Sequence, residues 1–112
     1  MTEADIHDVF AAFGPVRLRR MFGGSGIYAD DVMIALEAYG EIYLKADAIS
    51  QPTFEAAGSR PFVYEKDGRT ATMSYWLLPD EAREEPEAVI PWARLALEAA
   101  KRKPVKASRK KR

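Results

Sequence analysis

The only stretch of this chain with the composition of a phosphate-binding loop contains Gly23, Gly24 and Gly26. Such a loop binds phosphate when a helix N-terminus or a Lys-Ser/Thr pair follows it. Here the strand-like pair Ile27-Tyr28 follows, and no such lysine is present. We therefore interpret the three glycines as a structural bend between strand segments and expect no cofactor. If Gly24 has a positive φ in that bend, Gly24→Val destabilises the domain.

Metal and triad chemistry are limited by two residue counts, since His7 is the only histidine and cysteine is absent. A zinc site needs three or four ligands, which one histidine without cysteine cannot anchor. The same scarcity disfavours Ser–His–Asp and Cys–His catalysis. The lack of cysteine also excludes a disulfide framework. We expect no metal site, and His7 is interpreted as a surface or half-buried helix residue.

Acidic side chains occur in adjacent groups, as general acid–base chemistry would require. Neighbouring acids in turns and at helix starts usually serve solvation and capping. Catalysis would need them desolvated across a cleft, of which the sequence gives no sign. We therefore predict that the protein is not an enzyme and has no catalytic residues. The groups are Asp30-Asp31, Glu65 with Asp67, and Glu84-Glu85 with Glu87.

Aromatic residues flank the glycines and return near residue 75, with arginines beside the first group. One interpretation is packing within the sheet and the core. The other is a protein interaction surface, because Tyr and Trp are enriched at protein contacts. Such a surface would serve a protein partner or join two copies in a homodimer. The residues predicted to form it are Arg19, Arg20, Phe22, Tyr28, Tyr75 and Trp76.

The charge of the chain is divided between two regions. Residues 1–100 hold nine basic and all 17 acidic residues, whereas residues 101–112 hold eight basic residues and no acid. We predict a folded domain at 1–100 and a disordered basic tail at 101–112. The tail would bind nucleic acid weakly through phosphates, or only keep the chain soluble. The predicted nucleic-acid contacts are Lys101, Arg102, Lys103, Lys106, Arg109, Lys110, Lys111 and Arg112.

Membrane attachment is not expected from this sequence. No apolar run approaches the roughly 18 residues that cross a bilayer. The first fifteen residues contain Glu3, Asp5 and Asp8 and lack the apolar run of a secretory signal. We expect a cytoplasmic protein.

The periodicity of apolar residues predicts the elements that must position these groups. A first helix is indicated by the i, i+3, i+4, i+7 spacing of Ile6, Val9, Phe10 and Phe13, with Thr2 as its cap and Gly14-Pro15 at its end. Strands are expected at 16–22, which 26–29 either continues or restarts, and at 32–36, 41–45, 62–65 and 70–75. The strand at 32–36 is apolar on both faces.

Turns and two further helices complete the prediction. Asp30-Asp31 is expected to form a turn and Tyr39-Gly40-Glu41 a tight connection, and Asp67-Gly68 is a strong hairpin signal. A short helix is expected from a Ser50 cap to residue 57, before Gly58. The last helix is expected from Pro86, with Pro91 either kinking it or marking its true start; its buried stripe comprises Trp92, Leu95, Ala96 and Ala99.

Helices segregated around an antiparallel sheet make this an α+β two-layer sandwich, in the order helix, three strands, helix, two strands, helix.

In the order and spacing of several segments, the chain resembles the TfoX N-terminal domain family, named for the TfoX/Sxy regulators of bacterial competence. The resemblance covers about residues 4–100, and no single segment is specific. The segments are Arg20–Tyr28, Ile42–Asp47, Phe54–Gly58, Pro61–Tyr64 and Met73–Trp76.

The resemblance implies the helix–three strands–helix–two strands–helix arrangement, a topology similar to that of bacterial secretion chaperones, and it brings no catalytic residues. Competence regulators join this domain to a second, C-terminal domain, whereas here a basic tail follows. We expect a non-enzymatic regulatory or adaptor domain that acts through protein contacts. The alternative is a weak, nonspecific nucleic-acid-binding protein that uses its tail.

Overall fold

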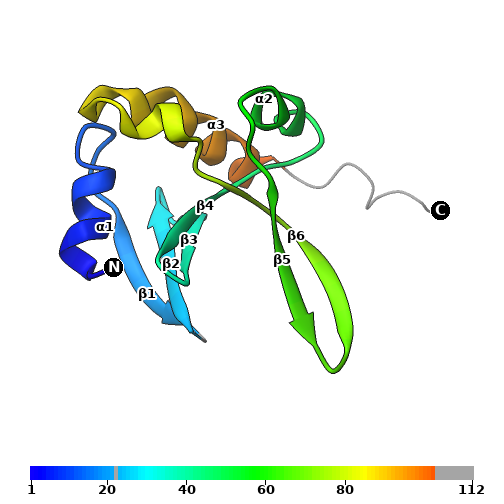
Figure 1. Cartoon of the computed structure of the whole chain (residues 1–112). Helices are drawn as coiled ribbons and strands as arrows, with labels where there is room; N and C mark the ends of the chain where they lie inside the picture. The colour runs from blue at the N-terminus through cyan, green and yellow to red at the C-terminus, as the bar shows by residue number, and fades with distance from the viewer. Residues whose placement is uncertain (22, 103–112) are drawn as a thin grey trace.

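Residues 1–21 and 23–102 are described by the structure of this chain, a computed structural model. In this part of the chain, six strands form one antiparallel sheet in the order β1-β2-β3-β4-β6-β5 (Figure 1). The elements are α1 (Glu3–Val9), β1 (Arg17–Met21), β2 (Gly24–Ala29), β3 (Val32–Ala38), β4 (Glu41–Lys45), α2 (Gln51–Ala56), β5 (Pro61–Lys66), β6 (Arg69–Leu77), the 3-10 helices η1 (Asp80–Arg83) and η2 (Pro86–Ala88), and α3 (Val89–Lys101). The predicted α+β class is confirmed.

Four strands precede α2, whereas the sequence predicted three. Strands β1 and β2 pair as a hairpin, in which Arg17 pairs with Tyr28 and Met21 pairs with Gly24. Gly23 lies between the two strands with a φ of +69°, a conformation that glycine adopts without steric strain. The segment 26–29 therefore belongs to a new strand, β2, and does not continue the first.

The other three predicted tight connections are confirmed as two-residue turns. Both central residues of each turn have positive φ, which is the pattern of the type I′ turn that matches the twist of antiparallel strands. The pairs are Asp30-Asp31 (+51° and +65°), Tyr39-Gly40 (+55° and +78°) and Asp67-Gly68 (+56° and +76°).

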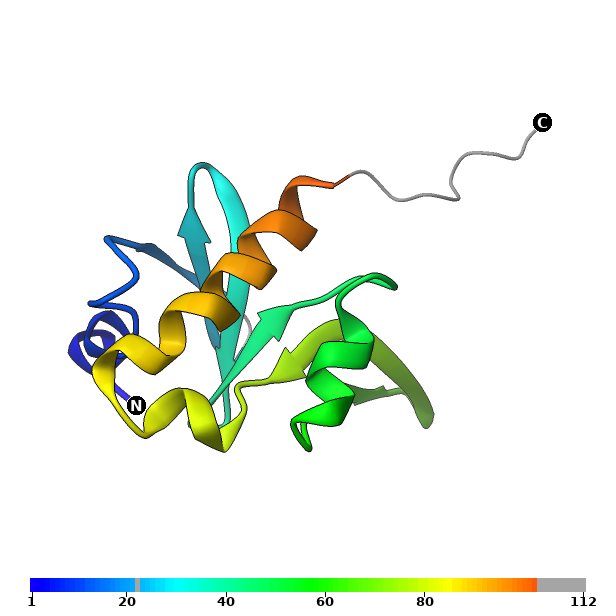
Figure 2. The ribbon, with the colours of Figure 1, turned by 90° about the horizontal axis from the view of Figure 1, so that it is seen from above.

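The three α-helices cover one face of the sheet, and the main core lies between the two layers. Figure 2 shows α3 crossing over the strands, where it packs on β3 and β4. Phe54 from α2 lies between two tryptophan rings, with its centroid 5.1 Å from that of Trp92 and 6.3 Å from that of Trp76. Ile6 of α1 and Phe10, which follows the last residue of that helix, enter the same core, as their spacing predicted. The helix itself ends at Val9 and not at the predicted Gly14-Pro15.

The ends of the two short helices are set by local hydrogen bonds and by one glycine. Thr2 caps α1, as predicted, and with Asp5 it forms a full capping box: Asp5 N donates to Thr2 Oγ1 (3.1 Å), and Thr2 N donates to Asp5 Oδ2 (2.9 Å). Ser50 precedes α2, but the prediction that its side chain caps the helix is wrong, because Ser50 Oγ accepts from Asp47 N (3.0 Å) instead. Gly58 ends α2 with a φ of +82°.

The last helical region has two stages. Pro86 begins η2, which leads directly into α3. Pro91 is the third residue of α3 and therefore lies in its first turn, where a missing N–H breaks no helical hydrogen bond. Pro91 thus neither kinks the helix nor marks its first residue.

Strand β6 belongs to the central sheet only at its C-terminal end. Of its nine residues, Tyr75, Trp76 and Leu77 pair with β4. Its earlier part pairs with β5, and the β5–β6 hairpin projects beyond the other strands (Figure 1). We call this projecting part, residues 62–73, the arm.

Candidate functional site

The face of the sheet opposite the helices is the candidate functional site, and we call it the open face. Because strand residues alternate between faces, Leu36 and its partner Tyr43 lie here, while their neighbours face the core. Within residues 1–21 and 23–102, only strand side chains build the apolar cluster on this face. Its members are Leu36, Ala38, Tyr43, Met33, Phe62, Tyr75 and Leu77.

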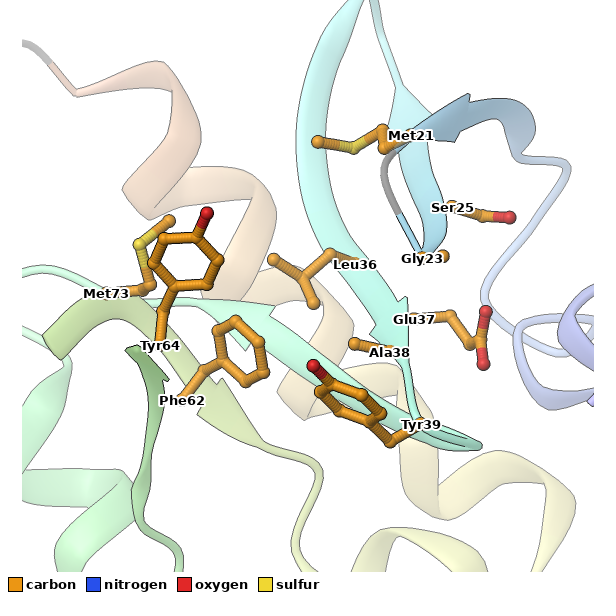
Figure 3. Close-up of a pocket in the computed structure, with 11 residues that line it drawn as sticks. Met21, Gly23, Ser25, Leu36, Glu37, Ala38, Tyr39, Phe62, Tyr64 and Met73 are labelled. Atoms are coloured by element: carbon orange, nitrogen blue, oxygen red, sulfur yellow. The ribbon is translucent and has the colours of Figure 1, made fainter. Parts of the chain in front are cut away.

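An apolar groove with a volume of about 290 Å³ runs between the β1–β2 hairpin and the arm. In Figure 3, Phe62, Tyr64 and Met73 form one wall, Leu36 lies in the middle, and Met21 comes from the opposite hairpin. Phe62 is held in place by Tyr43, since their ring centroids are 4.8 Å apart. The groove is therefore lined by residues from five strands, β1, β2, β3, β5 and β6.

Two glycines of β2 lie where a side chain would not fit without displacing its neighbours. A Cβ atom on Gly24 would collide with the backbone carbonyl oxygen of Glu37 on the neighbouring strand. A Cβ atom on Gly26 would lie 2.9 Å from Met21 Sδ and would displace that side chain. Only Gly23 forms the predicted bend; Gly24 and Gly26 lie inside a strand. Gly24 does not have the positive φ expected of it, so its requirement for glycine is a close approach between strands.

Cations cover two tyrosines at the other end of the open face. The Cζ atom of Arg17 lies 5.8 Å from the ring centroid of Tyr28, and Lys45 Nζ lies 5.2 Å from that of Tyr75. Lys45 Nζ also donates a hydrogen bond to Ser74 Oγ (2.7 Å). Burial, and secondarily the nearby Tyr28, raise the pKa of the Tyr75 hydroxyl. This end of the face is therefore aromatic and positively charged.

The predicted interaction surface is divided between the two sides of the sheet. Arg19, Tyr28 and Tyr75 occupy open-face positions, since Arg19 pairs with Gly26 and Gly26 with Leu36. Arg20 alternates to the other side, where it lines a hollow beside Thr2 and Glu3. Trp76 is only 7% exposed and packs against Phe54, so the alternative core interpretation holds for it. Phe22 lies outside the described residues.

Six large apolar or aromatic residues of the groove were not predicted from the sequence as site residues. They share an exposed or open-face position on a strand or turn, and they are Met21, Leu36, Tyr39, Phe62, Tyr64 and Met73. The available signal was apolar character on both faces of segment 32–36, together with apolar residues two apart in β5 and β6. A strand whose second face is also apolar needs a partner for that face.

One of the three predicted acidic groups, Asp30-Asp31, forms exposed ion pairs at its turn. Asp31 binds Arg17 Nη2 (3.0 Å), and Asp30 binds Lys101 Nζ (3.0 Å). The other predicted groups, Glu65 with Asp67 and the glutamates at 84, 85 and 87, are exposed, as is His7. Among the described residues, no three His, Cys, Asp or Glu side chains are placed to hold a metal ion together.

The first two residues of the predicted tail belong to the folded domain. Lys101 is the last residue of α3 and binds Asp30. Arg102 binds Asp47 through Nε (2.6 Å) and Nη2 (2.9 Å). The hydrogen bonds from Arg102, aided by that from Ser50 N, hold the pKa of the Asp47 carboxyl at about 2, below the ordinary 3.8. The other predicted nucleic-acid contacts, Lys103, Lys106, Arg109, Lys110, Lys111 and Arg112, lie outside the described residues.

Within the part of the chain that the structure describes, no helix combines the length and the apolar character that crossing a membrane requires.

The chain is similar to a known protein family and to a distantly related protein. The sequence model of the TfoX N-terminal domain matches residues 8–100, which run from α1 to nearly the end of α3. The DNA transformation protein TfoX1 of Aliivibrio fischeri (strain ATCC 700601 / ES114) is 27% identical over 85 residues. That alignment covers 76% of this chain but 41% of TfoX1, so the chain spans less than half of this relative. Since the family match includes both the helix-side core and the open face, the chain belongs to the TfoX N-terminal domain family.

Proposed function

We propose that this domain is a regulatory or adaptor module that acts through protein contacts made by its open face. The family is associated with the regulation of competence, and a DNA transformation protein is among the relatives. The observation that carries the proposal is the apolar groove on a sheet face whose helices all lie on the other side.

The exposure of the groove side chains supports a contact surface. Met21, Tyr64 and Met73 are each more than a third exposed, yet they lie together around one groove. Contiguous apolar patches on soluble monomers are usually small, and larger ones mark interaction sites. At about 290 Å³, the groove is at the lower limit of the roughly 300–1,000 Å³ typical of small-molecule pockets. Its size suits the apolar anchor residues of a protein partner.

The chemistry at the groove supports a contact rather than a reaction. Among the residues that the structure describes, its lining includes one carboxylate, that of Glu37, which accepts a hydrogen bond from Gly40 N (3.1 Å) in the β3–β4 turn. The remaining lining consists of apolar or aromatic side chains, glycines and Ser25. Such a surface binds by excluding water and offers no positioned acid–base pair. Weak nucleic-acid binding by the basic residues beyond Arg102 stays a prediction.

Site-specific photocrosslinking in the native cells tests this proposal. A benzophenone amino acid replaces Tyr64 in the groove, and the matched control replaces Arg94, which is exposed on α3. We expect a light-dependent adduct with one defined protein from position 64 and none from position 94. Equal adducts from both positions, or none from the groove, would contradict the proposal.

A further inference from the structure

The open face carries charge of the opposite sign to the rest of the domain. Six of the 17 basic residues lie beyond Arg102, so the described part of the chain holds 11 basic against 17 acidic residues. Yet Arg17, Arg19 and Lys45 all occupy open-face register positions. The two acids on or beside this face are both engaged: Glu41 is bound to Arg83 (3.2 Å), and Glu37, which lines the groove, accepts a hydrogen bond from Gly40 N (3.1 Å). The open face is therefore a cationic surface on an acidic domain.

Two of these cations remain available for a partner. Arg17 shares its charge with Asp31, at 3.0 Å. Within residues 1–21 and 23–102, neither Arg19 nor Lys45 forms an ion pair, and Lys45 binds only the neutral Ser74 and the ring of Tyr75. Charge complementarity across a contact sets specificity and the rate of association. A partner with acidic residues next to its apolar ones fits this arrangement.

The groove itself suits flexible recognition of aliphatic or aromatic side chains. Met21 and Met73 line opposite sides of it, and the unbranched, polarisable thioether adapts to partners of different shape. Leu36 lies between them, and the glycines of β2 leave room beside it. The groove therefore accepts apolar anchors without demanding one fixed shape.

Tyr39 provides an independent observation. It lies at the groove edge, is 86% exposed, and has a φ of +55° (Figure 3). A non-glycine residue in this conformation costs about 1 kcal/mol, and Asn or Asp would suit the turn better. An exposed tyrosine gains little packing in return within the free domain. Backbone strain at the rim of a binding site is typical of a residue that contacts the binding partner.

We infer that the groove receives a short segment of a partner protein in which apolar side chains are flanked by Asp or Glu. This inference rests on the proposed protein-contact function and adds the chemistry of the partner. The acids would meet Arg19 and Lys45, the apolar residues would fill the space between Met21 and Met73, and Tyr39 would close over them.

Three other occupants fit the open face less well. A second copy docked face to face would bring Arg19 and Lys45 against the same cations. A basic segment would be repelled in the same way. For nucleic acid, Tyr28 and Tyr75 are the rings nearest to the cations, but Arg17 and Lys45 already cover them, which hinders the base stacking that single strands require.

Three synthetic peptides of equal length test the inference against the full chain. One combines leucine and phenylalanine anchors with glutamates, the second replaces the glutamates by lysines, and the third keeps the glutamates but replaces the anchors by alanines. Binding is followed by fluorescence anisotropy and by NMR of carbon-13 methionine methyls. We expect the first peptide alone to bind and to shift the Met21 and Met73 methyls.

Charge reversal provides the matched variants. Arg19→Glu combined with Lys45→Glu should weaken binding of the acidic peptide about tenfold, as expected from losing two exposed charge pairs and gaining repulsion. Arg94→Glu makes the same kind of change on α3, and binding should stay within about twofold, because the charge lies far from the groove and is screened. Tyr39→Asn, which suits the turn, should weaken binding while the domain stays folded.

The contrary outcomes separate the two proposals. Equal or tighter binding of the lysine peptide in the groove would overturn the charge inference but leave the protein-contact function standing. If no peptide shifts the two methyls, the inference fails, whereas the photocrosslink at position 64 decides the function on its own. Methyl shifts that depend on protein concentration without peptide, or tighter binding of a single-stranded oligonucleotide, would assign the groove to a second copy or to nucleic acid, and either would overturn the inference.

Discussion

Arg102 donates two parallel hydrogen bonds to the carboxylate of Asp47, from Nε to Oδ2 (2.6 Å) and from Nη2 to Oδ1 (2.9 Å). This geometry is the strong, bidentate form of the arginine–carboxylate pair. It fixes the end of α3 to the connection between β4 and α2, where Asp47 also exchanges hydrogen bonds with Ser50. One carboxylate thus joins the last helix to the middle of the chain.

Replacing that carboxylate should destabilise the domain measurably. Asp47→Asn keeps the shape of the side chain but removes the charge, so we expect the free energy of unfolding to fall by about 1–2 kcal/mol at pH 7. Urea unfolding followed by tryptophan fluorescence measures this. Asp30→Asn is the matched control: its pair with Lys101 is exposed, asparagine tolerates its positive φ, and we expect a loss below about 0.5 kcal/mol. Equal losses in both variants would contradict the special role of Asp47.

The same pair predicts a defined dependence on pH. The folded state lowers the pKa of Asp47 from 3.8 to about 2, so the ionised carboxylate stabilises the folded domain. This contribution is complete above about pH 4 and is lost as the pH falls through the folded pKa near 2. The stability difference between the wild type and Asp47→Asn should therefore be constant from pH 7 to about pH 5 and shrink below about pH 4. A difference that persists unchanged at the acidic end would show that the pair does not titrate as described.

Substitutions at Gly23 and Gly24 should lower the free energy of unfolding by different amounts, because the two positions require glycine for different reasons. Gly24→Ala forces a Cβ atom into the carbonyl of Glu37, so the strands must separate, and we expect a loss of about 3 kcal/mol or more. The Cβ atom of Gly23→Ala meets no atom within 4 Å, but alanine must adopt a φ of +69°. We expect this substitution to lower the free energy of unfolding by about 1–2 kcal/mol. Thermal unfolding of both variants measures the order. A larger effect at Gly23 than at Gly24 would refute the close approach between β2 and β3.

Phe54 should be among the most sensitive positions of the core. It is fully buried between Trp76 and Trp92, so Phe54→Ala leaves a cavity and should cost about 3–5 kcal/mol. Denaturant unfolding gives the value, and the tryptophan emission should shift as water reaches the rings. Ile49→Ala is the neighbouring control, since Ile49 is 65% exposed, and its effect should stay within about 0.5 kcal/mol.

Tyr39 should show opposite effects on stability and on binding. Tyr39→Asn gives the β3–β4 connection an Asn-Gly pair, the preferred sequence for a type I′ turn, and should raise the free energy of unfolding by about 0.5–1 kcal/mol. Calorimetry measures the gain, and the photocrosslink from position 64 reports the contact in the same variant. A stable variant with an unchanged contact would leave Tyr39 without the role inferred here.

Much of the fold follows from local patterns in the sequence. The spacing of Ile6 and Phe10, the Thr2–Asp5 capping box and the Asp67-Gly68 turn each depend on neighbouring residues, so they could be predicted. The β1–β2 hairpin could not, because adjacent glycines permit both a bulge and a reversal, and the choice depends on how the strands pair. Ser50 was misassigned for a similar reason: the backbone of Asp47 competes for its hydroxyl.

The site was harder to predict because it depends on the face to which each strand residue points. Tyr75 and Trp76 are neighbours of similar character, yet one lies on the open face and the other in the core. A shift of one residue in register exchanges the two faces, and no local pattern fixes that register. The groove residues Leu36 and Tyr64 come together only through the order of the strands in the sheet.

Because one wall of the groove lies on the arm, the width of the groove can change. Tyr64 and Met73 sit on a two-stranded extension whose register is irregular between Pro61 and Val63, whereas Met21 and Leu36 sit on the central sheet. Two-stranded hairpins are marginal by themselves and open at low free energy. The arm can therefore change its angle to the central sheet while the core between the sheet and the helices stays intact. Substitutions in the arm would change which partner binds and would have little effect on the free energy of unfolding of the domain.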